Sequence, residues 1–306
     1  MVEVTPPRVE GTITVAGRRR LAFAEFGDPH GRTVFWLHGT PGARRQIPEE
    51  ARVVAQELGI RLIGIDRPGV GGSTPHLYDS LLGFAADLGV VADRLGVERF
   101  ALVGLSGGGA YVLAAAHALP DRVAAAGVLG GVAPTRGEDA PPGGVLGRVR
   151  PLAPLLSVFR VPLSAAATGL IWALRPFASP VLDVYARFSP EGDRRVFARP
   201  EMKAMFIDDL LRGTRTGMRG PIFDAILFLR PWGFSVRGIT TPVRWWHGDA
   251  DHIVPLAHAE RMVSLLPDAE LYVRPGESHL GTLGIAQEIL TTILDAWDGR
   301  ATARLA

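Results

Sequence analysis

One motif in the chain has the spacing of a nucleophilic site: Gly104-Leu105-Ser106-Gly107-Gly108, of the form G-x-S-x-G. It lies between an apolar run and a stretch with helical periodicity, the setting in which this pattern forms a sharp strand-to-helix turn that presents a serine hydroxyl. Small residues around the serine permit the turn, and the following helix aims its N–H groups at an oxyanion. The alternative is a glycine-rich turn with an incidental serine. Motif and setting together favour Ser106 as a catalytic nucleophile.

A serine hydroxyl needs a general base near neutral pH, and the eight histidines of the chain are the candidates. His279 lies in a loop between an expected strand and the last expected helix, at the carboxyl edge of a sheet, where catalytic groups collect. Other histidines lie upstream of the serine or within expected helices, as His117 and His258 do. We therefore expect His279 to be the base.

The base in turn needs a carboxylate to fix its tautomer and stabilise its charged form. Two candidates, Asp249 and Asp251, follow an expected strand at 242–248. Asp249 is nearer the strand, where a short acidic side chain commonly caps a turn. Asp251 lies past the turn, and we expect it to be the acid, with Asp249 as the alternative.

The same segment also permits a metal site. His247, Asp249, Asp251 and His252 resemble the pattern H-x-H-x-D-H, with an aspartate where its second histidine would stand, and such a cluster can bind zinc or iron. The segment comes after a complete serine motif, however, and no further histidine-rich segment precedes it. The chain has no cysteine and no dinucleotide-binding glycine motif after its first apolar run. We expect neither a metal nor another cofactor.

Short apolar runs that alternate with helix-periodic stretches predict an α/β fold: a mostly parallel sheet with helices on both faces. An N-terminal hairpin at 10–16 and 20–26 precedes it. The expected strands are 33–39, 61–66, 99–104, 122–131, 242–248 and 270–276, and the expected helices are 48–58, 79–95, 107–119, 255–266 and 282–297.

The alternation stops between 133 and 235. This segment opens with a Pro/Gly-rich linker and carries only helical patterns, near 152–159, 163–175, 179–188, 201–216 and 221–230. We expect an α/β core formed by 1–132 and 236–306, with 133–235 inserted as a helical lid. Its many aromatic residues indicate an apolar acyl or alcohol pocket. The candidate pocket residues are Leu105, Trp172, Phe206, Phe228 and Trp232.

Composition excludes several classes of protein. The chain has 306 residues, 47% of them hydrophobic and 21% charged, which is ordinary for a globular core. Its formal net charge is only +2, and basic residues are not gathered in one stripe, so we do not expect nucleic-acid binding. The longest uncharged run, 100–120, is broken by the serine motif, and we expect no membrane span. No signal peptide is visible, so we expect a cytoplasmic protein.

The order of five motifs resembles the α/β-hydrolase superfamily over about 10–298, which implies that fold with an inserted lid. In such proteins the residue after His-Gly and the residue after the nucleophile donate their N–H groups to the oxyanion, which implies Thr40 and Gly107 here. The motifs are His38-Gly39-Thr40-Pro41-Gly42, Asp66-Arg67-Pro68-Gly69-Val70-Gly71-Gly72-Ser73, the serine motif, Gly248-x-x-Asp251 and His279.

Within the superfamily, the resemblance is to proline iminopeptidases and related esterases. Haloalkane dehalogenases and epoxide hydrolases place aspartate at the nucleophile position, so Ser106 argues against both. Iminopeptidases are expected to carry tryptophan next, where this chain has Gly107. His38 and Asp66 fit structural roles in turns, and Arg44 and Arg45 are either contacts for a substrate carboxylate or solvated side chains.

These observations predict a serine hydrolase that cleaves small to medium apolar carboxylic esters through an acyl-enzyme, with a small-molecule apolar ester as its partner. Three alternatives stay open. They are an iminopeptidase-like aminopeptidase, a cofactor-free lyase or carbon–carbon bond hydrolase, and a ligand receptor that keeps the triad but turns over slowly.

Overall fold

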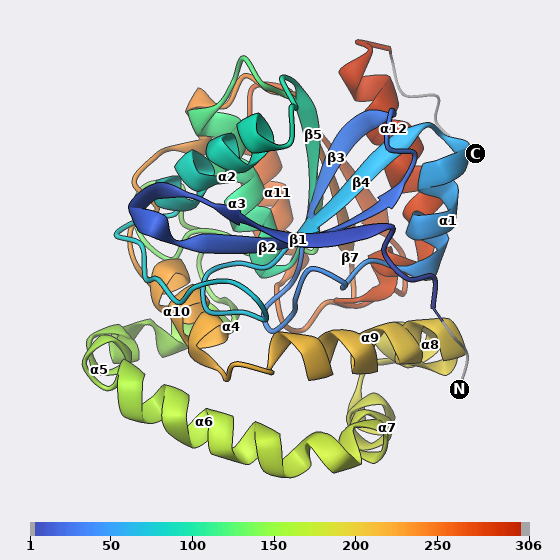
Figure 1. The fold of residues 1–306 in the computed structure, drawn as a ribbon. Helices are drawn as coiled ribbons and strands as arrows, with labels where there is room; N and C mark the ends of the chain where they lie inside the picture. The colour runs from blue at the N-terminus through green and yellow to red at the C-terminus, as the bar shows by residue number, and fades with distance from the viewer. Residues whose placement is uncertain (1–3, 301–306) are drawn as a thin grey trace.

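The fold is built on an eight-stranded sheet with the order β1-β2-β4-β3-β5-β6-β7-β8, in a computed structural model that describes residues 4–300 (Figure 1). Strands β1, β2 and β4 pair antiparallel, and every other pair is parallel. This confirms the prediction of a mostly parallel sheet. The strands are β1 (Val9–Thr14), β2 (Arg20–Gly27), β3 (Arg32–Leu37), β4 (Ile60–Ile65), β5 (Phe100–Leu105), β6 (Val123–Leu129), β7 (Val243–Gly248) and β8 (Ala269–Arg274).

Helices cover both faces of the sheet. Helices α2 (Leu82–Arg94), α3 (Gly107–Ala118) and α11 (Leu256–Leu265) contribute to the hydrophobic core on one face. On the other face, α1 (Glu49–Glu57) and α12 (Ala286–Trp297) pack against the sheet. Successive residues of a central strand alternate between the two cores, as Phe35 and Trp36 of β3 do. Burial on both faces is the reason that these strands are continuous apolar runs in the sequence.

The segment between β6 and β7 consists of helices and the loops that join them. We call its helices α4–α10 the inserted segment: α4 (Gly144–Val149), α5 (Ala153–Val158), α6 (Arg160–Leu174), α7 (Ala178–Phe188), α8 (Glu191–Ala198), α9 (Pro200–Gly213) and α10 (Arg219–Leu229). The sequence patterns did not predict α4 or α8. Both are short, and the charged start of α8 obscures the face that it buries through Val196 and Phe197.

The inserted segment lies beyond the carboxyl edge of the sheet. Helices α8 and α9 are next to that edge, and α5, α6 and α7 lie farther out (Figure 1). Within residues 4–300, no single helix has both the length and the apolar character to cross a membrane. The segments Gly144–Val158 and Arg160–Phe188 pass that test only as a pair, which is bent by 100°.

Candidate active site

Ser106 lies at the turn from β5 to α3 in a strained backbone conformation, with φ 52° and ψ −117°. Its N–H donates to the carbonyl oxygen of Leu129 in β6, at 2.7 Å. The turn is possible only because its neighbours lack side chains. A Cβ atom on Gly104 would lie 2.6 Å from the carbonyl of Gly108, and one on Gly108 would lie 2.3 Å from the carbonyl oxygen of Leu37. The folded turn therefore presents the Ser106 hydroxyl at the edge of the sheet.

The structure brings the three predicted catalytic side chains into one hydrogen-bonded row. The Nε2 atom of His279 lies 2.9 Å from Oγ of Ser106. The Nδ1 atom of the same ring lies 2.7 Å from Oδ2 of Asp251. The three residues come from three separate turns, after β5, β7 and β8. A proton can therefore pass from the hydroxyl to Nε2 while the carboxylate holds the ring.

Asp251 is held in its ionised form. Burial alone would raise its pKa, but the hydrogen bond and charge of His279 and a backbone N–H bond from Val254 bring the pKa below the ordinary value. Its second oxygen, Oδ1, accepts the N–H groups of Ile253 at 2.8 Å and Val254 at 2.9 Å. These bonds fix the carboxylate, so that its other oxygen faces the imidazole.

Asp249 and His247, which belong to the metal pattern in the sequence, bind other groups of the protein. Asp249 accepts the N–H of Gly276 at 2.8 Å, which is the turn-capping role considered for it. His247 bonds the carbonyl oxygen of Val254 through Nε2 at 2.7 Å, and burial lowers its pKa, so it stays neutral beside Asp251. No group of three or more potential metal ligands was found within residues 4–300.

Thr40 and Gly107 lie close to each other beside Ser106. A Cβ atom on Gly107 would be 2.6 Å from Oγ1 of Thr40 and 2.8 Å from the ring of Phe228, so the loop after β3 approaches the first residue of α3 closely. Neither backbone N–H donates to another group of the described chain. A free N–H group at the N-terminus of α3 and a second one from the adjacent loop are suited to receive an oxyanion.

A buried ion pair fixes the loop that carries Thr40. Arg67 and Asp224 of α10 are almost fully buried and lie 2.7 Å apart. Arg67 also donates to the carbonyl oxygen of Gly39 at 2.9 Å, and Oγ1 of Thr40 donates to Asp224 at 2.7 Å. The hydroxyl of Tyr111 donates to the same carboxylate at 2.6 Å. Asp224 was missed in the sequence, although a single acid in the apolar run PIFDAILF is a signal of a buried partner.

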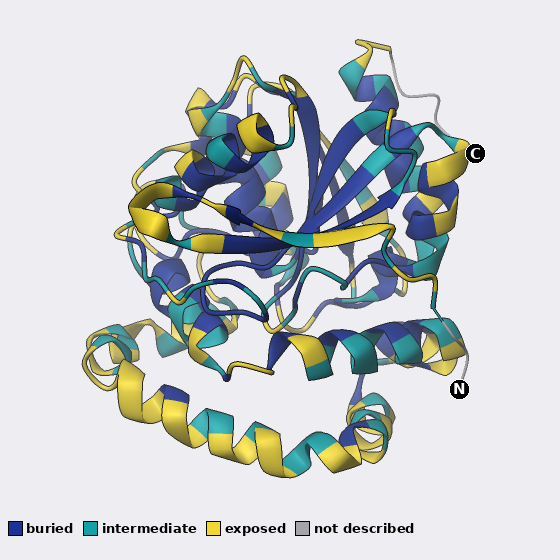
Figure 2. Cartoon of the chain, viewed as in Figure 1, coloured by how far each residue is buried: buried dark blue, intermediate teal, exposed yellow. Residues whose placement is uncertain are grey.

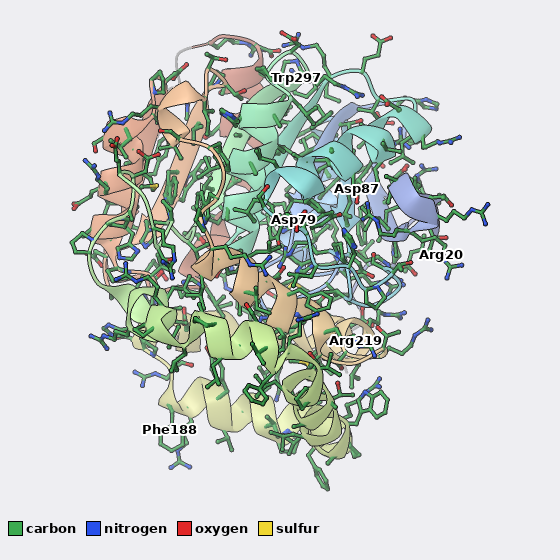
Figure 3. The ribbon with its side chains drawn as sticks, turned by 90° about the vertical axis from the view of Figure 1, so that its left-hand side faces the viewer. Arg20, Asp79, Asp87, Phe188, Arg219 and Trp297 are labelled. Atoms are coloured by element: carbon green, nitrogen blue, oxygen red, sulfur yellow. The ribbon has the colours of Figure 1, made fainter. Side chains whose placement is uncertain are left out.

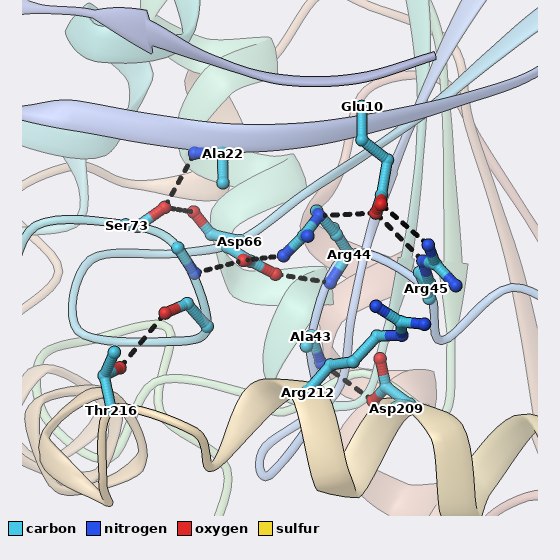
Figure 4. A network of polar contacts seen from close by, with 12 residues as sticks. Glu10, Ala22, Ala43, Arg44, Arg45, Asp66, Ser73, Asp209, Arg212 and Thr216 are labelled. Atoms are coloured by element: carbon cyan, nitrogen blue, oxygen red, sulfur yellow. Dashed lines mark hydrogen bonds and ion pairs between the residues drawn. The ribbon is translucent and has the colours of Figure 1, made fainter. Parts of the chain in front are cut away.

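Two further buried aspartates of the inserted segment hold loops of the site. Asp209 of α9 accepts the N–H of Ala43 at 2.9 Å (Figure 4). Burial, with the nearby negative charge of Asp66, raises the pKa of Asp209 to about 8. Asp193 of α8 accepts the N–H of Leu280, next to His279, at 2.7 Å. The inserted segment thus contacts both the Thr40 loop and the His279 loop.

Arg44 and Arg45 belong to a structural network rather than to a substrate contact. Both guanidinium groups bind Glu10 of β1, at 3.0 and 2.6 Å (Figure 4). Arg44 also pairs with Asp66 at 2.6 Å, and Asp66 accepts the N–H of Gly72 at 2.9 Å, as its proposed turn-capping role requires. Neither arginine lines the cavity at Ser106.

A cavity of about 350 Å³ opens at Ser106 and His279. Its lining is mostly apolar and includes two of the candidate pocket residues, Leu105 and Phe206. The sequence did not identify Tyr185 of α7, Phe197 of α8 or Leu210 of α9, which also line it. The cavity is therefore formed between the core and helices of the inserted segment.

Three candidate pocket residues do not line this cavity. Trp172 is about half exposed, and its indole N–H donates to the carbonyl oxygen of Thr214 at 3.0 Å. Phe228 is buried in the core, with its ring behind Gly107. Trp232 is also in the core, next to Phe234. Helical periodicity shows that such residues are apolar but not which neighbour they contact, which is why these three predictions were wrong.

Comparisons with known proteins agree with this fold. A family model described as alpha/beta hydrolase fold matches residues 32–144. The proline iminopeptidase of Xanthomonas citri is 35% identical over 115 residues, which are 37% of this chain and 36% of that protein. The match thus spans little more than a third of that relative. A non-heme haloperoxidase of Rhodococcus erythropolis is 29% identical over 87% of this chain and 92% of its own length.

Solved structures match over nearly the whole chain. A thermophilic esterase from Thermogutta terrifontis superposes with a TM-score of 0.68 at 22% identity, and covers 94% of this chain and 99% of its own. An epoxide hydrolase from Vigna radiata gives a TM-score of 0.70 at 18% identity, with 95% and 98% covered. Family match, sheet order and strand-to-helix serine turn agree, and the chain has the alpha/beta hydrolase fold.

Proposed function

We propose that this α/β hydrolase is a serine esterase that cleaves small to medium apolar carboxylic esters through an acyl-enzyme intermediate. The observation that carries the proposal is the row Ser106–His279–Asp251, which opens into an apolar cavity beside two free N–H groups. A nucleophile, a base, an orienting acid and oxyanion donors within reach of one reacting carbonyl are the parts that acyl transfer needs.

The reaction follows from the geometry of these parts. As Oγ of Ser106 attacks the acyl carbon, Nε2 of His279 takes the hydroxyl proton, and the carbonyl oxygen becomes an oxyanion. The N–H groups of Thr40 and Gly107 stabilise it, by about 3 kcal/mol per donor in comparable sites. His279 then gives its proton to the departing alkoxide. Water repeats the attack on the acyl-enzyme and releases the acid and the serine hydroxyl.

The charge of the cavity supports an uncharged substrate. Among the residues that the structure describes, Asp209 is the only acidic one that lines it, and its pKa of about 8 leaves this carboxyl mostly protonated near neutral pH. The remaining lining is mostly apolar, with few polar side chains besides Ser106 and His279. Such a cavity favours an apolar acyl or alcohol group because a charged group would lose its hydration without gaining a partner.

An aminopeptidase is the second candidate, because the matched relatives include proline iminopeptidases. That reaction needs acidic groups to hold the substrate ammonium. Within residues 4–300, the cavity offers no carboxylate that is mostly ionised at neutral pH for that purpose, so the ester reaction takes precedence.

The test is a panel of p-nitrophenyl esters of increasing acyl length, run beside L-proline p-nitroanilide. We expect ester turnover that falls at least about 10⁴-fold in Ser106→Ala. Phe206→Trp should shift the preference to shorter acyl chains because it fills the cavity. Trp172→Phe is the matched control, since this side chain lies outside the cavity, and its profile should be unchanged. Faster cleavage of the anilide than of every ester would contradict the proposal.

A further inference from the structure

The outer side of the inserted segment is an exposed apolar surface. Fourteen of the eighteen large apolar side chains that are exposed within residues 4–300 belong to residues 145–188. Most of α6 is exposed on the side away from the sheet (Figure 2). We call this surface the outer face and define it by five exposed side chains: Val158, Val161, Leu170, Phe177 and Phe188. Contiguous apolar surface of this kind marks a binding site for another molecule or a membrane.

The inner side of α6 is the one that binds the rest of the protein. Oγ1 of Thr168 accepts the N–H of Met218 at 3.0 Å, and the indole N–H of Trp172 reaches Thr214. On the opposite side, Leu170 is 65% exposed and Phe188 of α7 is 83% exposed. Figure 3 shows Phe188 pointing away from the body of the molecule. The outer face is therefore not an internal packing surface of the described chain.

The charged residues of 140–182, the stretch that carries most of the outer face, are all of one sign. Residues 140–182 contain four arginines and no acidic residue, although the whole chain has 33 basic and 31 acidic residues. Arg160 and Arg175 stand at the two ends of α6, which has no charged residue between them. The other two arginines are Arg148 and Arg150. None of the four forms an ion pair with a residue of the described part, 4–300. Arg150, Arg160 and Arg175 donate to backbone carbonyl oxygens, so their positive charges are not neutralised and can attract an anionic surface.

These features favour one binding partner for the outer face. An apolar helix face with aromatic side chains and flanking arginines is suited to lie in the interface of an anionic lipid layer, with the arginines at the headgroups. A second copy of the chain fits less well. Two-fold pairing through the outer face would place the same four unpaired arginines against each other with no acidic residue from 140–182 between them.

The outer face is also continuous with the active site. A second cavity, of about 690 Å³, is lined by Val184 and Phe188 of α7 on one side and by Ser278 and His279 on the other. Tyr185 lines both this cavity and the one at Ser106. A molecule that leaves a surface at α7 therefore has a path to the reacting groups that is lined on one side by apolar side chains of α7.

We propose that the outer face docks on an anionic lipid surface, and that the second cavity leads lipid-soluble esters from this surface to Ser106. The first part stands on the outer face and its charges alone. The second part rests on the proposed esterase function, and it names the substrate class as apolar esters that reside in a lipid interface.

Flotation of the full chain with lipid vesicles tests the docking. We expect binding to vesicles of phosphatidylcholine mixed with phosphatidylglycerol and much weaker binding to phosphatidylcholine alone, by about fivefold for each arginine at the surface. High salt should reduce this difference because it screens the arginines. Arg148→Gln/Arg160→Gln should bring binding to the mixed vesicles toward the level seen with phosphatidylcholine alone.

The apolar contribution is tested by Val161→Gln/Leu170→Gln, which keeps the charge and changes only exposed positions. We expect about tenfold weaker binding to mixed vesicles because both side chains lose their place in the apolar layer. The matched control is Val53→Gln on α1, which is 47% exposed outside the outer face and should bind like the wild type. Neither variant touches the cavity at Ser106, so both should hydrolyse a soluble ester at the wild-type rate.

The failures of the two proposals are distinguishable. No binding of folded wild type to mixed vesicles, or equal loss in Val53→Gln, would overturn the docking, even with full hydrolysis of soluble esters. A dimer in analytical ultracentrifugation that Val161→Gln/Leu170→Gln dissociates would overturn it as well, and would assign the outer face to a second copy. Vesicle binding without hydrolysis of any soluble ester would overturn the esterase function and leave the docking in place.

The passage of an ester from the lipid surface to Ser106 is tested by a separate measurement. The wild type should hydrolyse a long-chain ester embedded in mixed vesicles faster than Val161→Gln/Leu170→Gln does, while the two are equal on a soluble ester. Equal rates on the embedded ester would overturn the second part of the proposal.

Discussion

At the scale of single residues, Asp249 and Asp251 show how position decides chemistry. They are two places apart in one loop, yet Asp249 accepts a backbone N–H from Gly276 and Asp251 accepts the imidazole of His279. The difference arises because Asp251 is also fixed by two N–H groups that follow it in the chain. Of the two, only Asp251 is placed to orient the ring of His279.

Asp251→Asn should therefore lower kcat by about 10⁴-fold, since the amide favours the wrong tautomer of His279. Asp249→Asn keeps an oxygen for Gly276 and should retain nearly full activity. The measurement is kcat on a soluble p-nitrophenyl ester for both variants. Full activity in Asp251→Asn with loss in Asp249→Asn would show that the acid is wrongly assigned.

A site residue can be predicted from the sequence when its role leaves a pattern in the residues next to it. Ser106 and His279 could be predicted because a strand-to-helix turn and a loop after a strand leave local patterns. Trp172 and Trp232 could not be placed, because the direction of an aromatic side chain in the inserted segment depends on contacts between helices. Asp224 was missed for the same reason, since its partner Arg67 is far away in the chain.

At the scale of elements, the inserted segment is fastened to the core by three buried aspartates on three helices. Asp193 of α8 binds the His279 loop, while Asp209 of α9 and Asp224 of α10 bind the loop after β3. Each carboxylate holds a loop that carries a group proposed to act in catalysis. The geometry of the site therefore depends on helices that are not connected directly to any strand of the sheet.

Asp224→Ala should destabilise the protein by about 3–5 kcal/mol because it leaves the guanidinium of Arg67 buried without its partner. Glu191→Ala is the control: its pair with Arg195 on α8 is exposed and contributes at most about 0.5 kcal/mol. Denaturant unfolding gives both free energies. Equal effects of the two substitutions would contradict the account of this ion pair.

Asp209 gives a prediction about pH. Its folded pKa of about 8 is above the ordinary value of 3.8, so between these values the unfolded chain releases a proton that the folded chain keeps. Stability is therefore lost as pH rises from about 4 to about 8, at up to about 1.4 kcal/mol per pH unit. Asp209→Asn should remove this loss, while Asp208→Asn should not.

The check is the free energy of unfolding at several pH values across that range for the wild type and both variants. The same pH slope in Asp209→Asn as in the wild type would show that this carboxyl is ionised in the folded protein.

At the scale of the whole molecule, the protein has a central sheet covered on both faces and a layer of inserted helices. Some of these helices are bonded to the core more firmly than others. The central strands could be predicted closely because their burial on both faces makes them apolar throughout, as in β3 and β5. The start of α8 could not, because it is charged in sequence and buries only one face after folding. The placement of helices α5–α7 depends on a few contacts that the sequence does not reveal.

Hydrogen exchange should reflect this difference in how firmly the inserted helices are bonded to the core. Peptides from α9 and α10 should be protected nearly as well as β5, because these helices bury apolar residues and bond the core through Asp209 and Asp224. Peptides from α5 to α7 should exchange faster, since most of their side chains are exposed. Protection of α5–α7 equal to that of β5 in the free protein would contradict this picture.

The most direct test of the central claim is the intact mass of the protein after reaction with a fluorophosphonate. The account predicts one covalent adduct on the wild type, located at Ser106, and no adduct on Ser106→Ala. It also predicts that hydrolysis of p-nitrophenyl esters disappears in step with labelling. An adduct that persists in Ser106→Ala, or a folded wild type that neither reacts with the probe nor hydrolyses an ester, would contradict the account.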